Sequence, residues 1–307
     1  MKNYLAIDIG GTAVKGGIVT EKGTIVLQYK LAASFDNYKT KLFETVKKAI
    51  LQGYELADKA GVEVEGLAIS ATGDVDSNEL KIIGGGGNIP DWENIDVKAE
   101  VAAILHREVK MSLVNDANCA AIGEKWLGAA KEFKDCIVYT IGTGIGGGIF
   151  VDGKILNGSR GFAGNIGHMV IADGQRECAC GNSGCFEKMA STKALLLDAK
   201  AVGFEGGGEQ LFAEAKTNEK LQEVIERFYH YHGIAMGSLI HIFNPEAIIV
   251  GGGISAQGDS LIDNLRSHIK AHTLPHFFER VQVLKATLGN DAGIIGATKY
   301  FIDKFND

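Results

Sequence analysis

The sequence predicts an α/β fold built from two similar portions. Each portion opens with an apolar strand, a glycine-rich turn and a second strand, at residues 4–19 and again at 136–156. In both portions strand-like and helical segments then alternate, which is typical of α/β proteins. A chain of 307 residues is long enough to form two separate cores.

The elements of the first portion follow from their spacing. Strands at 4–10, 14–19 and 24–31 are separated by tight turns, which indicates antiparallel hairpins. A helix is expected at 39–60, where apolar residues recur at helical spacing. The remaining elements are, in order, a strand at 66–71, a loop at 84–92, a helix at 96–105, a strand at 112–116 and a helix at 117–128.

The second portion repeats the opening hairpin. Residues 136–156 have the pattern strand, glycine turn, strand, turn. The elements expected after it are a helical region at 216–243, a strand at 247–253, a helix at 259–272, a strand at 281–287 and a final helix at 292–305.

Composition excludes several classes of protein. A hydrophobic share of 46% argues against disorder, and no apolar run reaches the roughly 20 residues that a membrane helix needs. The net charge of −7 argues against a nucleic-acid binder, which usually carries a basic face. The first residues lack the layout of a signal peptide. We therefore expect a cytoplasmic protein with no membrane or nucleic-acid partner.

Glycine is concentrated in loops that follow apolar strands. Two such loops cover residues 8–12 and 141–148, and a third cluster covers 248–255. Glycine lets phosphate oxygens approach the backbone N–H groups closely, and threonine hydroxyls add donors. The candidate nucleotide-binding residues are Gly10, Gly11, Thr12, Gly142, Thr143, Gly144, Gly251, Gly252 and Gly253. Ordinary tight hairpins are the alternative for either of the first two loops.

Two known nucleotide-binding motifs are matched in part, but the residues or elements that must follow them are absent. Gly142, Gly144 and Gly147 fit the dinucleotide pattern G-x-G-x-x-G, but a strand-like stretch follows where a helix is required. Residues 148–154 fit the start of a P-loop, but Ile155 stands where Ser or Thr must bind magnesium.

Acidic and amide side chains lie at strand ends. Asn115 and Asp116 end an apolar strand just before a helix, and a helix N-cap formed by Asp116 is one explanation for the acid. Phosphoryl transfer to a hydroxyl needs a base, and a carboxylate such as Asp116 suits that role. Asp8, at the mouth of the first glycine loop, is the candidate to orient Mg²⁺ through water.

A metal site is predicted between residues 168 and 185. His168, Cys178, Cys180 and Cys185 are the ligand set of a closed, structural Cys₃His zinc site. A loop fixed by zinc would hold its polar neighbours Asn165, His168 and Glu187 in place to bind sugar hydroxyls. His268 and His272, spaced one helical turn apart, are expected on a solvated helix face, and Cys119 and Cys136 in the core.

Six segments carry a resemblance to a known family: AIDIGGT, VNDANCAAIGE, TIGTGIGGGI, GFAGNIGH, CACGNSGCFEKMAS and NPEAIIVGGGIS. Together they resemble the ROK family of sugar kinases and sugar-responsive repressors, within the actin-like ATPase superfamily. The family's cysteine motif, G-H followed after nine residues by C-x-C-G-x-x-G-C-x-E, is matched by residues 167–187. The resemblance implies a two-lobed actin-like ATPase (ribonuclease H-like) α/β fold with a structural zinc loop.

The resemblance also implies an activity and a domain layout. The implied activity is ATP-dependent phosphorylation of a hexose, with magnesium as cofactor and Asp116 as the base. The resemblance further implies a structural zinc ion and, commonly, a homodimer. The implied ligands of the sugar hydroxyls are Asn115, Asp116, His168 and Glu187. We expect a small lobe at 1–117, a large lobe at 118–290 with the zinc loop and adenosine site, and a C-terminal helix at about 291–307 that packs on the small lobe through small residues.

Two positions depart from the family pattern. Ala13 stands where many members have lysine, and Lys15 lies two residues on. Asn165 stands where the family usually has a glutamate that binds near the C1 and C2 hydroxyls of the sugar. Because Asn165 is shorter and uncharged, we expect a β-glucoside such as cellobiose, phosphorylated on the 6-hydroxyl of its non-reducing glucose. Glucose and N-acetylmannosamine are the alternative substrates.

A sugar-sensing repressor is the alternative outside the enzymes. Such proteins carry a winged helix-turn-helix of several tens of residues ahead of the first glycine loop, whereas Asp8 lies within the first ten residues. The candidate base and both phosphate loops favour a kinase.

Overall fold

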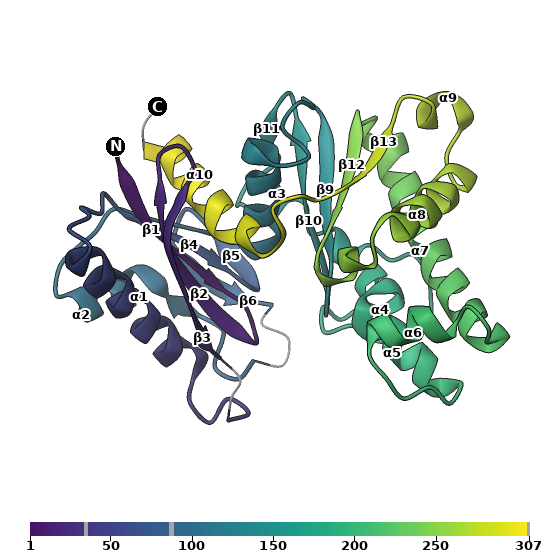
Figure 1. The fold of residues 1–307 in the computed structure, drawn as a ribbon, viewed down its shortest axis with the longest axis horizontal. Coiled ribbons are helices and arrows are strands. Elements are labelled where there is room, and N and C mark those ends of the chain that lie inside the picture. Colours follow the sequence, from purple (N-terminus) through teal and green to yellow (C-terminus); the bar gives the residue numbers. More distant parts are fainter. Residues whose placement is uncertain (34–35, 86–88, 306–307) are drawn as a thin grey trace. The chain divides into compact units, whose positions relative to one another are not determined.

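The computed structural model describes residues 1–33, 36–85 and 89–305 (Figure 1). The chain divides into two compact units. Unit 1 comprises Met1–Lys131, Asn157–Ala163 and Asn290–Asp307, and unit 2 comprises Glu132–Leu156 and Gly164–Gly289. The expected lobe boundary at residue 117 falls in the first turn of a helix that belongs to unit 1.

Unit 1 is built on a five-stranded sheet in the order β3-β2-β1-β4-β8. Its first three strands are antiparallel, and β1, β4 and β8 run parallel. Its elements are β1 (Asn3–Ile9), β2 (Ala13–Thr20), β3 (Ile25–Ala32), α1 (Leu42–Lys59), β4 (Leu67–Ala71), β5 (Asp74–Asp76), β6 (Lys81–Gly84), β7 (Ile95–Asp96), α2 (Val97–Leu105), β8 (Met111–Asn115), α3 (Asp116–Leu127) and α10 (Ala292–Phe305).

A small antiparallel sheet, β5-β6-β7, was not expected from the sequence. Strand β6 ends at Gly84, where the predicted loop at 84–92 begins. Residues 86–88 of that loop, and residues 306–307 of the expected C-terminal helix, lie outside the described residues.

The two faces of β1 pack against different helices because side chains alternate along a strand. Ile7 belongs to the core formed with α1. On the other face Tyr4 contacts Phe301 of α10, with ring centroids 5.2 Å apart, and Ala6 packs with Ile294. The central strands β1 and β4 are therefore buried on both faces, whereas the edge strand β3 is exposed at every second residue.

Helix α10 packs closely on α3 through small residues. A Cβ atom at Gly296 would lie 1.7 Å from the Cys119 carbonyl oxygen, and one at Gly123 would lie 2.5 Å from the Ala292 carbonyl oxygen. Neither glycine tolerates a side chain, so these small residues let α10 and α3 approach closely. Cys119 and Cys136 are both buried, as predicted for core residues.

Unit 2 repeats the strand order of unit 1. Its sheet runs β11-β10-β9-β12-β13, with β11, β10 and β9 antiparallel and β9, β12 and β13 parallel. This matching order confirms the predicted duplication. Its elements are β9 (Cys136–Ile141), β10 (Ile145–Val151), β11 (Lys154–Ile155), a 3₁₀ turn (Ile166–His168), α4 (Phe186–Ala190), α5 (Thr192–Ala201), α6 (Gly208–Glu214), α7 (Glu219–Phe243), β12 (Ala247–Gly251), a 3₁₀ turn (Gly253–Gln257), α8 (Asp259–Ala271), α9 (Pro275–Phe278) and β13 (Gln282–Lys285).

Helices α7 and α8 of unit 2 pack side by side, and this corrects one expectation. His268 and His272 do not lie on a freely solvated face. Their ring nitrogens contact Glu226 and His230 of α7, at 2.7 Å and 3.2 Å. The i, i+4 spacing shows that the two histidines share a helix face, but not what that face packs against.

Within the described part of the chain, none of the helices combines the length and apolar character needed to span a bilayer.

Candidate active site

The predicted acidic residues of unit 1 meet at one edge of its sheet. Strands β1, β4 and β8 are parallel and adjacent, and their register pairs Asp8 with Ser70 and Ala71 with Asn115. Asp116 follows as the first residue of α3. The carboxyl ends of parallel strands are the usual ligand-binding edge of an α/β sheet. The fold thus brings Asp8, Asn115 and Asp116 together, as expected.

Asp8 is held in one orientation by two neighbours. The Ser70 hydroxyl donates to Asp8 Oδ1 at 2.7 Å, and Lys15 Nζ lies 3.4 Å from Oδ2. Lys15 also donates to the Asn290 carbonyl oxygen at 3.1 Å. A Cβ atom at Gly293 would lie 2.7 Å from the Asp8 carboxyl carbon, so glycine there gives this carboxylate its space.

Asp116 has the properties of a base that works near neutral pH. Desolvation of its carboxyl group and the negative charge of Asp8 raise the pKa of Asp116 to about 6. Hydrogen bonds from the Ala117 N–H and the Thr72 hydroxyl act in the opposite direction and lower that pKa. A general base is most effective when its pKa lies close to the working pH.

Asn115 is fixed at both ends of its amide. Its Oδ1 accepts hydrogen bonds from the Ala117 and Asn118 N–H groups, at 3.0 Å and 3.2 Å, so it caps α3. Its Nδ2 donates to the Gly73 carbonyl oxygen at 2.9 Å. The cap is therefore formed by Asn115, one residue before the expected Asp116, which is the first residue of α3.

The second and third glycine loops are neighbours in unit 2. Residues 142–144 connect β9 to β10, and Gly251 at the end of β12 pairs with Thr140 of β9. Gly252 has φ +86°, and a Cβ atom there would lie 2.4 Å from the Ile141 carbonyl oxygen. Strand β10 follows the 142–144 turn directly, where a dinucleotide-binding fold would have a helix. The structure therefore agrees with the rejection of that fold.

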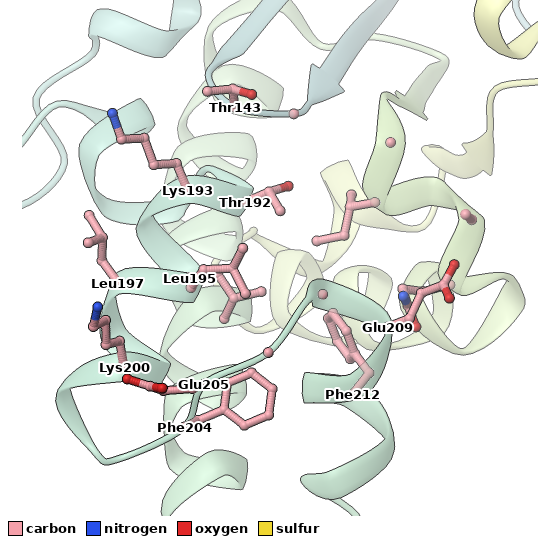
Figure 2. Close-up of a pocket in the computed structure, with 18 residues that line it drawn as sticks. Thr143, Thr192, Lys193, Leu195, Leu197, Lys200, Phe204, Glu205, Glu209 and Phe212 are labelled. Atoms are coloured by element: carbon pink, nitrogen blue, oxygen red, sulfur yellow. The ribbon is translucent and has the colours of Figure 1, made fainter.

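A cavity of about 870 Å³ opens beside these loops (Figure 2). Gly142, Thr143 and Gly253 line one part of it. Its apolar lining comes from Leu195, Leu196, Phe204, Phe212 and Ile254, and Figure 2 shows the rings of Phe204 and Phe212 directed into the same space. Sites for drug-sized ligands have volumes of roughly 300–1,000 Å³, so the cavity has room for a nucleoside.

The sequence reasoning missed most of the lining residues of this cavity. They lie on α5 and α6, which were not predicted. A local signal for α5 exists, because the Ser191 side chain accepts a hydrogen bond from the Ala194 N–H at 3.2 Å and so caps that helix. Leu195, Leu196 and Ala199 then follow at helical spacing.

Glu187 lies against the 142–145 turn of the same unit. Its Oε2 accepts from the Ile145 N–H at 3.3 Å, and a Cβ atom at Gly144 would lie 2.3 Å from that oxygen. Lys188 Nζ lies 3.5 Å from Glu187 Oε1. This places a carboxylate directly beside a predicted phosphate loop.

The 3₁₀ turn Ile166–His168 joins Glu187 to the predicted metal loop. Phe186 donates its N–H to the Met169 carbonyl oxygen at 2.7 Å, which holds α4 beside this turn. Gly167 packs so tightly that a Cβ atom would lie 2.1 Å from the Ile145 carbonyl oxygen. Asn165 directly precedes the turn and His168 ends it. The structure therefore brings His168 and Glu187 into one small region.

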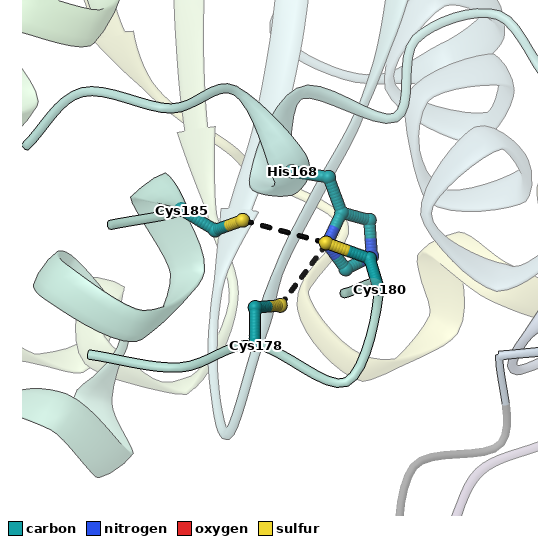
Figure 3. A group of neighbouring side chains, drawn as sticks. All are labelled: His168, Cys178, Cys180 and Cys185. Carbon is teal, nitrogen blue, oxygen red and sulfur yellow. Dashed lines mark hydrogen bonds between the residues drawn. The ribbon is translucent and has the colours of Figure 1, made fainter. Parts of the chain in front are cut away.

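The predicted zinc ligands converge on one point (Figure 3). The ligand atoms of His168, Cys178, Cys180 and Cys185 lie within 4.8 Å of one another. Cys178 Sγ is 3.5 Å from His168 Nδ1, and Cys180 Sγ is 3.5 Å from Cys185 Sγ. A tetrahedral zinc ion with Zn–S bonds of about 2.3 Å and Zn–N bonds of about 2.0 Å places its ligand atoms roughly 3.5–3.8 Å apart. The donor set and its spacing therefore fit zinc.

The backbone around this cluster is shaped for a tight loop. Gly184 has φ +73°, and a Cβ atom there would lie 1.6 Å from the Ala172 carbonyl oxygen. A hydrogen bond from the Asn182 backbone N–H is the main reason that the pKa of Cys180 falls to about 7, which favours the thiolate that metals bind. Four protein ligands leave no open coordination position, so the site is suited to a structural ion.

Comparison with known proteins places the chain in a family. The ROK family model matches residues 4–304, and the chain belongs to that family. It is 32% identical to a glucokinase of Halalkalibacterium halodurans, over 95% of this chain and 93% of that protein. It is 33% identical to a beta-glucoside kinase of Listeria innocua, over 98% of each chain. A xylose repressor of Bacillus subtilis is 29% identical, over 99% of this chain and 78% of the repressor.

A solved structure agrees with this assignment. The ROK family glucokinase of Streptomyces griseus, in complex with glucose and AMPPNP, superposes with a TM-score of 0.81 at 30% identity, covering 97% of this chain and 98% of that one. The predicted α/β fold of the actin-like ATPase superfamily is thereby confirmed.

Proposed function

We propose that this protein is an ATP-dependent kinase that phosphorylates the 6-hydroxyl of a hexose unit. One observation carries the proposal: a carboxyl group with a pKa raised to about 6, Asp116, at the carboxyl edge of a sheet that also presents Asp8. The glycine-lined cavity of unit 2 has the volume for the adenosine of ATP. The kinases among its relatives support the same reaction.

Asp116 is the proposed general base. It accepts the proton of the sugar 6-hydroxyl while the oxygen attacks the γ-phosphorus of ATP. The bond from that phosphorus to the β–γ bridging oxygen breaks, and ADP leaves with the electron pair. The proton on Asp116 then passes to solvent, which restores the carboxylate.

The other site residues bind and orient. We assign the phosphates to Gly10, Gly11, Thr12, Gly142, Thr143, Gly144, Gly251, Gly252 and Gly253, and the sugar hydroxyls to Asn115, Asn165, His168 and Glu187. Mg²⁺ bound with ATP neutralises phosphate charge, and Asp8, fixed by Ser70 and Lys15, is the group that would orient it. Zinc would be held by His168 and the three cysteines, and would fix His168 near Glu187.

The preferred acceptor is a β-glucoside such as cellobiose. Asn165 is uncharged and shorter than the glutamate usual in the family, which leaves space for a glycosidic substituent at C1. The beta-glucoside kinase among the relatives supports this preference. Glucose and N-acetylmannosamine are the competing acceptors.

The test is ADP release with ATP and Mg²⁺ across cellobiose, glucose, N-acetylmannosamine, fructose and allose. We expect turnover of cellobiose well above glucose, and abolished in Asp116→Asn. Asn165→Glu should shift the preference toward free glucose. A wild-type preference for a monosaccharide would retain the kinase and reject the β-glucoside assignment.

A sugar sensor is the second candidate, because a xylose repressor is among the relatives. No turnover on any sugar by folded, zinc-loaded protein would favour the sensor. We further propose a homodimer located in the cytoplasm, which light scattering and cell fractionation would test.

A further inference from the structure

Helices α7 and α8 carry a group of polar side chains that the proposed kinase reaction does not use. Glu226 and His230 lie one turn apart on α7, and His268 and His272 lie one turn apart on α8. They face one another in two pairs. His272 Nε2 is 3.2 Å from His230 Nδ1, and His268 Nε2 is 2.7 Å from Glu226 Oε1.

Two glycines of α7 set the backbone beneath these pairs. A Cβ atom at Gly233 would lie 2.6 Å from the His268 carbonyl oxygen and 2.6 Å from His272 Cδ2. One at Gly237 would lie 2.5 Å from the His272 carbonyl oxygen. The end of α8 therefore rests directly on the α7 backbone, and the imidazoles extend from a fixed framework.

Both ring nitrogens of His268 face oxygen atoms that can only accept hydrogen bonds. Its Nδ1 lies 2.9 Å from the Asn264 carbonyl oxygen, which can only accept, so Nδ1 carries a proton. In the neutral ring the unprotonated Nε2 then faces the Glu226 carboxylate. A second ring proton would join Nε2 to that carboxylate as an ion pair, so His268 holds Glu226 beside the His230–His272 pair.

The pair formed by His230 and His272 has the spacing of two ligands on one metal. With metal–nitrogen bonds of about 2.0–2.1 Å, adjacent imidazole nitrogens lie roughly 2.9–3.4 Å apart. The observed separation of 3.2 Å falls in that range. Imidazole nitrogen suits zinc, copper and nickel, and two histidines at i, i+4 on one helix face are a recurrent metal-binding arrangement.

We propose that the α7–α8 pair binds a divalent transition-metal ion of the Ni²⁺, Cu²⁺ or Zn²⁺ type, with His230 Nδ1 and His272 Nε2 as its first two ligands. Water completes the shell, because both ring nitrogens of the neighbouring His268 face oxygen atoms. This site is separate from the Cys₃His cluster, and it does not depend on the kinase assignment.

The experiment is a calorimetric titration of the zinc-loaded, full-length protein with Ni²⁺, while a chromogenic dye reports zinc release. We expect one Ni²⁺ per chain with no zinc released. His230→Gln and His272→Gln should each weaken Ni²⁺ binding by at least about tenfold. His276→Gln, an exposed histidine on α9, is the matched control and should bind Ni²⁺ as the wild type does.

Thermal melting gives an independent measurement. Because an ion that binds only the folded state raises its stability, Ni²⁺ should raise the Tm of the wild type and of His276→Gln, but not of the His230 and His272 variants. The proposal is overturned by no Ni²⁺ uptake, by uptake equal in all variants, or by uptake matched by zinc release. The Tm values without Ni²⁺ verify that each variant is folded.

Discussion

The two sheets of this protein have the same strand order, but their carboxyl edges carry different chemistry. In unit 1 the hairpin strand ends Asp8-Ile9-Gly10, and in unit 2 the matching strand ends Thr140-Ile141-Gly142. A carboxylate in one unit thus corresponds to a hydroxyl in the other. Unit 1 adds Asp116, whereas unit 2 adds an apolar cavity and a metal loop. The same strand order thus presents charged side chains in unit 1 and a ligand-sized cavity with a metal loop in unit 2.

The largest effect should come from removing the charge that only unit 1 has. Asp116→Asn keeps the shape of the side chain but cannot accept the hydroxyl proton, so kcat should fall by about 10²–10⁴-fold. Asp58→Asn, exposed on α1, is the control and should retain activity. Because folding raises the pKa of Asp116, its ionisation opposes stability above pH 6, and the variant should melt no lower than wild type. A loss of less than tenfold would contradict the role of base.

The second-largest effect should come from a substitution in the metal loop of unit 2. Cys185→Ser removes a thiolate from the Cys₃His cluster and should reduce zinc affinity by at least about 10–100-fold. The loss should raise the KM for sugar, since His168 and Glu187 are held beside that loop. Elemental analysis and initial rates measure both effects, with Cys136→Ala as a cysteine variant that should keep its zinc. Unchanged zinc content in Cys185→Ser would refute the assignment.

A substitution in the wall of the apolar cavity of unit 2 should have a smaller effect on activity. Phe212→Ala removes part of the wall proposed for adenine, and burying an aromatic side chain contributes about 1.5–3 kcal/mol. We expect the KM for ATP to rise roughly tenfold, with kcat nearly unchanged. Phe277→Ala, which does not line the cavity, serves as the comparison. An effect on the KM for sugar alone would show that the cavity binds something other than the nucleotide.

The smallest effect concerns the pH dependence set by unit 1. With the pKa of Asp116 raised to about 6, the rate should be constant above that pH and fall tenfold per pH unit below it. Thr72→Val removes a hydrogen bond that lowers this pKa, so the acid limb should move to higher pH. Thr72→Ser keeps the hydroxyl and should leave the profile in place. If the pH–rate profile of Asp116→Asn fell at the same pH as that of the wild type, the titrating group would be a residue other than Asp116.

Short-range features were predictable from the sequence. Apolar spacing indicates the strands and the long helices, and the glycine turns mark both hairpins. The metal cluster is encoded almost locally, since Cys178, Cys180 and Cys185 lie within eight residues. A helix cap at this point also follows from residue type, but it was expected at Asp116 and is formed by Asn115.

Features that depend on packing between distant segments were not predictable. Ser70 contacts Asp8 only because β1 pairs with β4 in one register. The contact between His230 and His272 depends on how α8 packs against α7 at Gly233. Helical spacing gives the direction of a side chain but not its partner, so these contacts required the fold.

The close packing of α10 in unit 1 has a consequence for the order in which the chain is made. Tyr4 on the first strand is covered by Phe301, and Asp8 owes its space to Gly293. Translation therefore produces the sheet of unit 1 long before the helix that covers one face of it. An apolar face of that sheet therefore stays uncovered until residues 292–305 have been synthesised and α10 can pack on it.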